Sequence, residues 1–65
     1  MLSLKEARKR ERYSQQQVAD YLGISRPTYR KLEKNPDLVT VEDAKRLSEL
    51  LHVSPQDIFF GPNCN

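Results

Sequence analysis

The segment from Ser14 to Asn35 constrains the fold most, because it reads as two short helices joined by a tight turn. Ser14 and Ser25 are residue types that cap helix N-termini, and Gly23 can adopt the left-handed conformation that ends a helix. Apolar side chains recur at helical spacing along one side of both helices: Val18, Ala19, Leu22, Ile24, Tyr29 and Leu32. We therefore expect two packed helices, the second of which turns a strongly basic face outward.

The chain has 65 residues, enough for one small domain. We expect that domain to span residues 1–65, with the two-helix motif at 14–35 and a short tail at 61–65. The single cysteine, Cys64, excludes an intrachain disulfide and a Cys/His metal cluster. No apolar run approaches the ~20 residues that cross a bilayer, and the N-terminus lacks the apolar core of a secretory signal. These features predict a cytoplasmic protein without membrane, metal or cofactor.

Further capping signals predict three more helices around the motif. A capping box at Ser3–Glu6 starts one that runs to about Arg12. Thr40 starts another, whose apolar stripe comprises Val41, Ala44, Leu47, Leu50 and Leu51. Ser54 and Pro55 start a short last helix with Ile58 and Phe59 facing inward. The predicted fold class is therefore all-α, with five helices.

The segment between the motif and the Thr40 helix is predicted to be a loop of about five residues. Asn35 tolerates the left-handed conformation, and Pro36 disfavours helical geometry in the residue before it. The motif's second helix should therefore end near Lys34. Its first turn tolerates Pro27, because the first four amides of a helix have no intrahelical acceptor.

The net charge of +2 hides an asymmetry along the chain. Residues 1–34 hold nine basic and four acidic side chains, which gives +5. Residues 35–65 hold two basic and five acidic side chains, which gives −3. Such a division suggests a basic face for a polyanion, although solvated helix faces would give the same count.

The motif resembles the helix-turn-helix of the Cro and lambdoid phage repressor family, also called the XRE family. The resemblance rests on a small residue, a turn glycine and an apolar residue followed by a core pair and an acid: Ala19, Gly23, Ile24, Tyr29, Leu32 and Glu33. It extends from about Leu4 to Phe59. It implies a compact five-helix lambda-repressor-like domain, with the helix-turn-helix at helices 2 and 3. It also implies a transcriptional regulator, a repressor, that binds double-stranded DNA with helix 3 in the major groove.

The resemblance implies base contacts from the first turns of the motif's second helix, at Arg26, Pro27, Arg30 and Lys31. Arg26 is the strongest candidate, because an arginine there can present two parallel donors to guanine. Which of Arg30 and Lys31 reads a base stays open. Pro27 offers only apolar contact, for example to a thymine methyl, and a role as a helix-start residue explains it equally well.

Helix N-termini and short polar side chains position a protein on the DNA backbone. Gln15, Gln16, Thr28 and Asn35 suit that role. In the family, the first glutamine of the first motif helix holds the backbone, which corresponds to Gln15, and the stretch leading out of the second helix corresponds to Lys34 and Asn35. Gln17 is better explained as the partner that closes the Ser14 capping box.

The resemblance also assigns structural roles. It implies a salt bridge between Arg8 and Glu33, and it places Tyr29 in the core, with the hydroxyl expected to reach the surface. Arg12 and Tyr13 stand where relatives commonly have a Gly-Leu pair. His52 reads as a capping or surface residue at a helix end, and Cys64 as an inert tail residue.

The interpretation includes a dimer, and two alternatives to it stay open. We expect a homodimer on a pseudo-palindromic operator, whose interface could come from Phe59, Phe60 and the outer side of the fourth and fifth helices. An antitoxin-like or anti-repressor module acting through a protein partner is the main alternative, and an RNA-binding adaptor is a weaker one because no stacking aromatics are firmly placed. We find no motif that supports an enzyme, and no sensor segment for a small-molecule effector.

Overall fold

Residues 3–58, the part of the chain that the structure describes, fold into helices without any strand. The structure is a computed structural model. Its elements are α1 (Leu4–Arg10), α2 (Gln15–Leu22), α3 (Arg26–Lys34), a 3₁₀ turn η1 (Pro36–Leu38), α4 (Val41–Leu51) and α5 (Pro55–Ile58). The all-α prediction is therefore confirmed for this part of the chain. Because α5 stops at the last described residue, the count of five helices stays a prediction. Phe59, Phe60, Cys64 and the tail at 61–65 lie outside the described residues.

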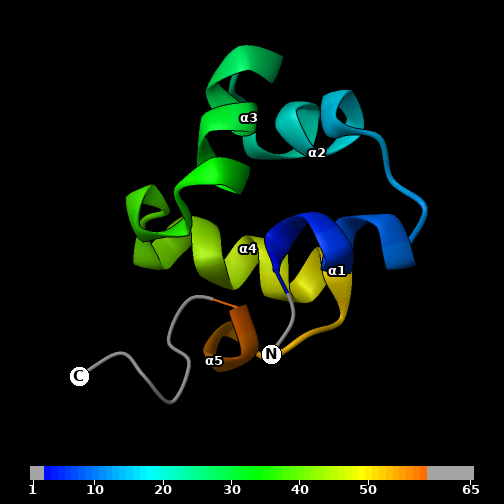
Figure 1. The fold of residues 1–65 in the computed structure, drawn as a ribbon, viewed down its shortest axis with the longest axis vertical. Coiled ribbons are helices and arrows are strands. Elements are labelled where there is room, and N and C mark those ends of the chain that lie inside the picture. The colour runs from blue at the N-terminus through cyan, green and yellow to red at the C-terminus, as the bar shows by residue number, and fades with distance from the viewer. Residues whose placement is uncertain (1–2, 59–65) are drawn as a thin grey trace.

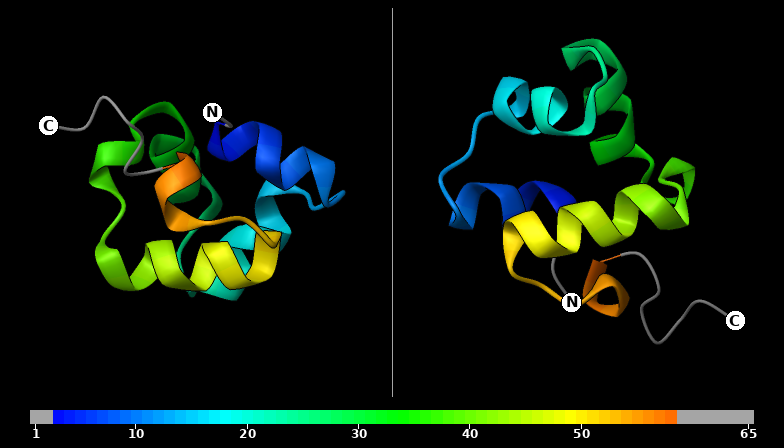
Figure 2. Two further views of the ribbon diagram at one scale, coloured as in Figure 1. Left: turned by 90° about the horizontal axis from the view of Figure 1, so that it is seen from below. Right: turned by 180° about the vertical axis from the view of Figure 1, so that it is seen from behind.

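The helices are arranged with the helix-turn-helix at one end of the molecule. Figure 1 shows α2 and α3 together at the top, α1 and α4 at the same level across the middle, and α5 below them. The right-hand view of Figure 2, seen from behind, shows the same order, with α4 lying between the motif and α5. The motif therefore rests on α1 and α4 and leaves its far side open.

Four of the helices begin with the predicted side-chain caps. The hydroxyl oxygens of Ser3 and Ser14 each accept a hydrogen bond at 3.0 Å from the amide three residues on. Ser25 and Thr40 do the same at 3.3 and 3.1 Å. Both predicted capping boxes are complete, because the Glu6 and Gln17 side chains accept from the cap amides in return. These caps set the helix starts independently of the core.

The turn between α2 and α3 depends on a left-handed residue. Gly23 has φ 73°, and the Ile24 amide donates to the Ala19 carbonyl at 3.0 Å, which closes α2. A Cβ at Gly23 would meet nothing within 4 Å. The requirement for glycine is therefore one of backbone conformation and not of space.

The turn between α1 and α2 uses the same geometry without glycine. Arg12 has φ 63°, and the Tyr13 amide donates to the Arg8 carbonyl at 3.2 Å. This left-handed turn ends α1 at Arg10, so the predicted extension to Arg12 was two residues too long. Arg12 thus adopts a left-handed conformation that glycine would adopt without strain.

We expect Arg12→Gly to raise the free energy of unfolding by about 0.5–1 kcal/mol. Glycine avoids the steric cost of the left-handed backbone, and part of that gain is offset by the larger conformational entropy of glycine in the unfolded chain. The check is a thermal melt, in which the midpoint should rise by a few degrees. Arg12→Ala is the matched control, since it removes the same side chain and keeps the strained backbone. A glycine variant no more stable than the alanine variant would contradict this account.

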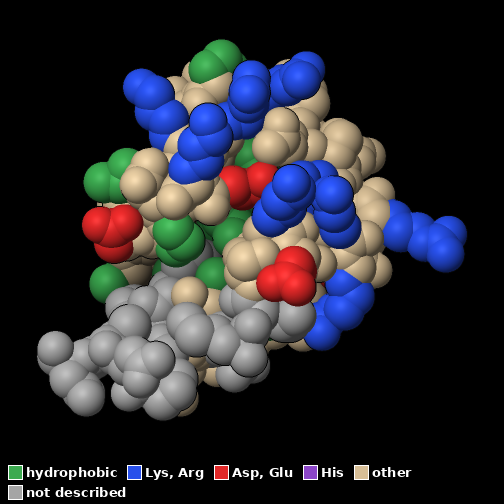
Figure 3. Space-filling model, in the orientation of Figure 1, with side chains coloured by type: hydrophobic (Ala, Val, Ile, Leu, Met, Phe, Trp, Pro, Cys, Tyr) green, Lys and Arg blue, Asp and Glu red, His purple; other side chains and the backbone are tan. Residues whose placement is uncertain are grey.

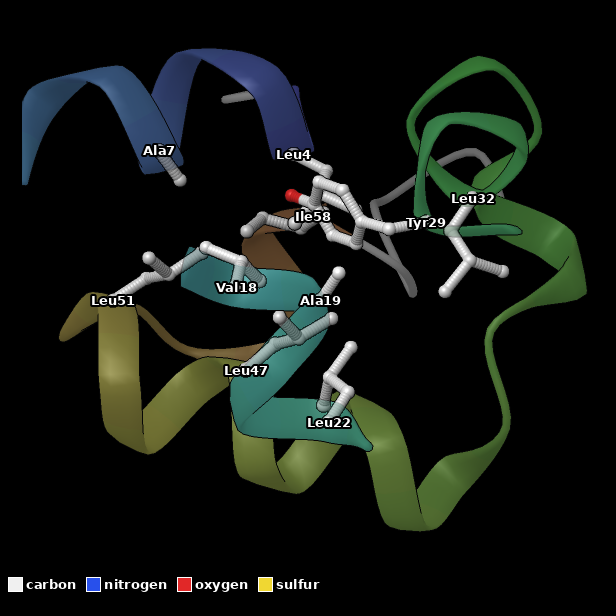
Figure 4. Close-up of a cluster of buried hydrophobic side chains, with 10 residues drawn as sticks. All are labelled: Leu4, Ala7, Val18, Ala19, Leu22, Tyr29, Leu32, Leu47, Leu51 and Ile58. Carbon is white, nitrogen blue, oxygen red and sulfur yellow. The ribbon is translucent and has the colours of Figure 1, made fainter. Parts of the chain in front are cut away.

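The core lies where all the helices meet (Figure 4). Its buried side chains are Leu4, Ala7, Val18, Ala19, Leu22, Tyr29, Leu32, Leu47, Leu51 and Ile58. Ile24 and Leu50 are partly buried against this cluster. Val41 was predicted to join it, and that prediction was wrong, because its side chain is 61% exposed at the first position of α4, beyond the edge of the core.

The connection from α3 to α4 differs from the predicted loop in two ways. Asn35 has φ −132° and ψ 77°, so it is not left-handed; the ring of Pro36 favours this more extended backbone in the residue before it. The loop also contains η1, which leaves Leu38 58% exposed. At the other end of α4, His52 caps the helix with φ 56° and is exposed, as expected.

Candidate nucleic-acid interface

Helix α3 divides into a buried face and a cationic face. Tyr29 and Leu32 are buried, whereas the four residues predicted to read bases are all exposed: Arg26, Pro27, Arg30 and Lys31. Lys34 is exposed as well. On the face drawn in Figure 3, Lys and Arg side chains gather over α3 and α1. The structure thus presents the cations of the motif together on its open side.

At the start of α3, the groups available to bind a ligand are mainly side chains, because few backbone amides are free. Ser25 Oγ accepts from the Thr28 amide at 3.3 Å and donates to Thr28 Oγ1 at 2.8 Å. Pro27 has no N–H and the Thr28 amide is already bonded, so of the first three residues of α3 only Arg26 has a free backbone amide. Thr28, predicted to contact phosphate, is exposed and can still donate its own hydroxyl hydrogen.

The start of α2 has two free backbone amides. The Ser14 hydroxyl oxygen accepts from the Gln17 amide, which leaves the amides of Gln15 and Gln16 without an acceptor in the helix. A hollow of about 340 Å³ lies here, lined by Arg8, Ser14, Gln15, Gln16 and Arg26. The hollow brings Gln15 and Gln16, both predicted to contact phosphate, together with Arg26, the strongest candidate for a base contact. The Arg26 guanidinium and the N-terminus of α2 make this hollow electrostatically suited to an anion.

Arg8 and Glu33 form an ion pair behind the hollow. Arg8 Nε lies 2.6 Å from Glu33 Oε2, and the two side chains are only 8% and 6% exposed. Arg8 Nη1 also donates to the Tyr13 carbonyl at 2.8 Å. The pair therefore ties α1, and the turn that follows it, to the last turn of α3.

The ion pair changes the titration of both partners. Burial alone would raise the pKa of Glu33, but hydrogen bonds from Arg8 and Gln15 outweigh it and hold the pKa below the ordinary value of 4.5. The hydrogen bond to Glu33 raises the pKa of Arg8. Both side chains are therefore charged at neutral pH.

Two further predicted phosphate contacts have their own intramolecular partners. Gln16 Nε2 donates to Asp20 Oδ1 at 2.8 Å, one turn along α2. Asn35 Nδ2 donates to the Lys31 carbonyl at 3.4 Å and so covers the end of α3. Both residues remain exposed.

The structure adds one contact that sequence reasoning missed. Gln15 Nε2 donates to Glu33 Oε1 at 3.0 Å, across 18 positions of the chain. Gln15 was predicted only as a phosphate contact, and no local signal links it to the end of α3. Only the packing of α3 on α2 brings the two together.

The hydroxyl of Tyr29 was predicted to reach the surface, and that prediction was wrong. The whole side chain is buried, with its ring extending from α3 toward Leu4 and Ile58 (Figure 4). The hydroxyl oxygen is enclosed without a hydrogen-bond partner among residues 3–58. Burial, reinforced by the Glu33 carboxylate, raises the pKa of this hydroxyl.

Residues 3–58 contain no group of three His, Cys, Asp or Glu side chains that could hold a metal ion. None of their helices is both long and apolar enough to cross a membrane.

Comparison with known proteins agrees with this geometry. A family model described as helix-turn-helix matches residues 4–58. Over 59 residues the chain is 37% identical to a Pyrococcus furiosus protein named a "putative HTH-type transcriptional regulatory protein", covering 86% of this chain and 19% of that protein. Over 61 residues it is 43% identical to YonR, an uncharacterized HTH-type transcriptional regulator derived from the SPbeta prophage of Bacillus subtilis, covering 89% of this chain and 54% of YonR.

The chain spans about a fifth of the first relative's length and about half of the second's. No solved structure matches it significantly. The family match nevertheless covers every described helix, including both helices of the motif and the turn at Gly23. The chain therefore belongs to the XRE family of helix-turn-helix DNA-binding domains.

Proposed function

We propose that the protein is a sequence-specific regulator of transcription that inserts α3 into the major groove of duplex DNA and acts as a repressor. The observation that carries this proposal is the division of α3. Its buried face packs in the core, while its cationic residues are exposed: Arg26, Arg30, Lys31 and Lys34. Of these, Arg26 lines the hollow at the start of α2. A major groove about 12 Å wide admits one helix presented in this way.

In this proposal, Arg26 reads a guanine. It occupies the first helical position of α3, and its exposed guanidinium can give two parallel donors to guanine O6 and N7. Arg30 and Lys31 follow one turn later and reach either bases or backbone. Pro27 contributes apolar contact only.

The backbone contacts come from residues around the two helix starts and the end of α3. The set is Gln15, Gln16, Thr28, Lys34 and Asn35. Its support is the hollow, in which the free amides of α2 meet the side chains of Arg8 and Arg26. A phosphate seated there would fix the angle at which α3 enters the groove, without itself reading sequence.

We further propose that two copies bind a pseudo-palindromic operator. Half-sites on successive major grooves lie ~34–36 Å apart, so two copies would add the base contacts of two α3 helices. Leu38 in η1 and Val41 at the start of α4 are exposed apolar residues that a contact between copies would cover. Light scattering should then show a dimer on DNA; a monomer both free and bound would remove this part of the proposal.

Selection of bound fragments from a random duplex library tests the proposed function directly. We expect enrichment of a short sequence repeated with inverted symmetry, its centres separated by about one helical turn. Competition with single-stranded DNA and structured RNA should leave the complex intact. Absence of any enriched sequence, or stronger binding to RNA, would contradict the proposal.

A further inference from the structure

The contact between Gln15 and Glu33 joins the start of α2 to the end of α3. Glu33 Oε1 accepts from Gln15 Nε2 at 3.0 Å, while Glu33 Oε2 accepts from Arg8 Nε at 2.6 Å. Arg8 Nη2 also donates to Oε1, at 3.5 Å, so Arg8 spans both carboxylate oxygens and shares Oε1 with Gln15. Because a carboxylate only accepts, it also fixes which end of the Gln15 amide faces inward.

This orientation leaves Gln15 prepared for a second acceptor. The amide nitrogen carries two hydrogens, and Glu33 takes one of them. No other acceptor among residues 3–58 takes the second. Gln15 is partly exposed and lines the hollow at the start of α2, so the second hydrogen is accessible to an anion there.

We propose that Glu33 is a positioning residue for DNA binding, which acts by holding the Gln15 amide ready for one phosphate of the backbone. This inference rests on the proposed function. Glu33 touches no DNA itself, since its side chain is 6% exposed and paired with Arg8. Holding a flexible side chain in place before binding removes an ordering penalty that is equivalent to about three- to tenfold in affinity.

Glu33→Gln changes both the ion pair and the acceptor for Gln15, so a second variant is needed to separate the two effects. A glutamine has one acceptor oxygen where the carboxylate has two, and Arg8, the stronger donor, would take it. The amide nitrogen of the new side chain would then face the Gln15 nitrogen and displace it. Arg8→Lys is the matched control, because it weakens the ion pair but leaves both carboxylate oxygens in place for Gln15.

The experiment uses the selected duplex, with single neutral methylphosphonates placed at each phosphate in turn. For the wild type, we expect neutralising one phosphate near the start of α2 to weaken binding about three- to tenfold. Gln15→Ala and Glu33→Gln should both lose that sensitivity at the same phosphate. Arg8→Lys should lower the melting temperature and keep the wild-type pattern of sensitivity.

Two results would overturn the inference: a wild-type pattern in Glu33→Gln, or a uniform weakening at every phosphate in that variant. A second measurement needs no variant. In the free wild-type protein, the side-chain amide of Gln15 should be less mobile by NMR relaxation than that of exposed Gln56, and equal mobility would also overturn it. Failure of the wild type to select any duplex would instead contradict the proposed function.

Discussion

Glu33→Ala is expected to lower the free energy of unfolding by about 3–5 kcal/mol, because it leaves the buried Arg8 charge without its partner. Arg8→Ala should have a similar effect on Glu33. A domain of 65 residues has roughly 3–10 kcal/mol of stability in total, so either change removes a large share of it. Thermal melting followed by circular dichroism should show a midpoint lowered by more than about 10 °C.

The double variant Arg8→Leu with Glu33→Leu is the control for this prediction. It leaves no uncompensated charge, so it should recover much of the stability that either single variant loses. Single variants that melt within a degree or two of the wild type would show that the pair contributes little.

The same pair gives the stability a dependence on acid pH. The pKa of Glu33 is lowered in the folded protein, so the unfolded chain binds its proton first as the pH falls. The contribution of the pair is therefore complete well above pH 4.5, the ordinary value, and is lost as the pH drops through the lower folded value. Melting between pH 7 and pH 3 should show a smaller acid loss in Glu33→Ala than in the wild type.

Arg26→Ala is expected to relax base preference at one position of the operator half-site, where the proposed guanine contact contributes about 1–3 kcal/mol of discrimination. Lys34→Ala should act differently, weakening binding to all sequences and lowering the slope of log affinity against log salt by about one. Both side chains are exposed and take part in no ion pair among residues 3–58, so the fold should survive. Titrations of matched and single-substituted duplexes at several salt concentrations provide the measurement.

Arg46→Ala is the matched control for both variants. Arg46 is half-exposed on α4, away from the motif, and pairs with Glu42 at 3.3 Å. Its loss should leave specificity and the salt slope close to those of the wild type. If Arg26→Ala and Lys34→Ala change binding in the same way, the division between base reading and backbone contact is wrong.

The parts of the fold that follow from neighbouring residues could be predicted. Ser3, Ser14, Ser25 and Thr40 each cap through an amide three residues away, and Gly23 supplies a left-handed turn on its own. Helix starts and the all-α class therefore depend on information local in the chain. The turn at Arg12 was harder, because an arginine gives no signal of a positive φ.

The parts that depend on distant packing could not be derived from neighbouring residues alone. The contact between Gln15 and Glu33 and the burial of the Tyr29 hydroxyl follow from how α3 lies against α1 and α2. Val41 has an apolar side chain at helical spacing, yet it lies outside the core because the first turn of α4 extends past the edge of the core. Periodicity gives the face of a helix but not how far along the helix the core extends.

The two faces of α3 differ in what a substitution would disturb. Tyr29, Leu32 and Glu33 are committed to the interior, whereas Arg26, Pro27, Arg30 and Lys31 stand on the surface. Changes among these four leave the core contacts and the caps in place. The domain is therefore a scaffold on which new operator preferences can evolve, or be engineered, one exposed side chain at a time.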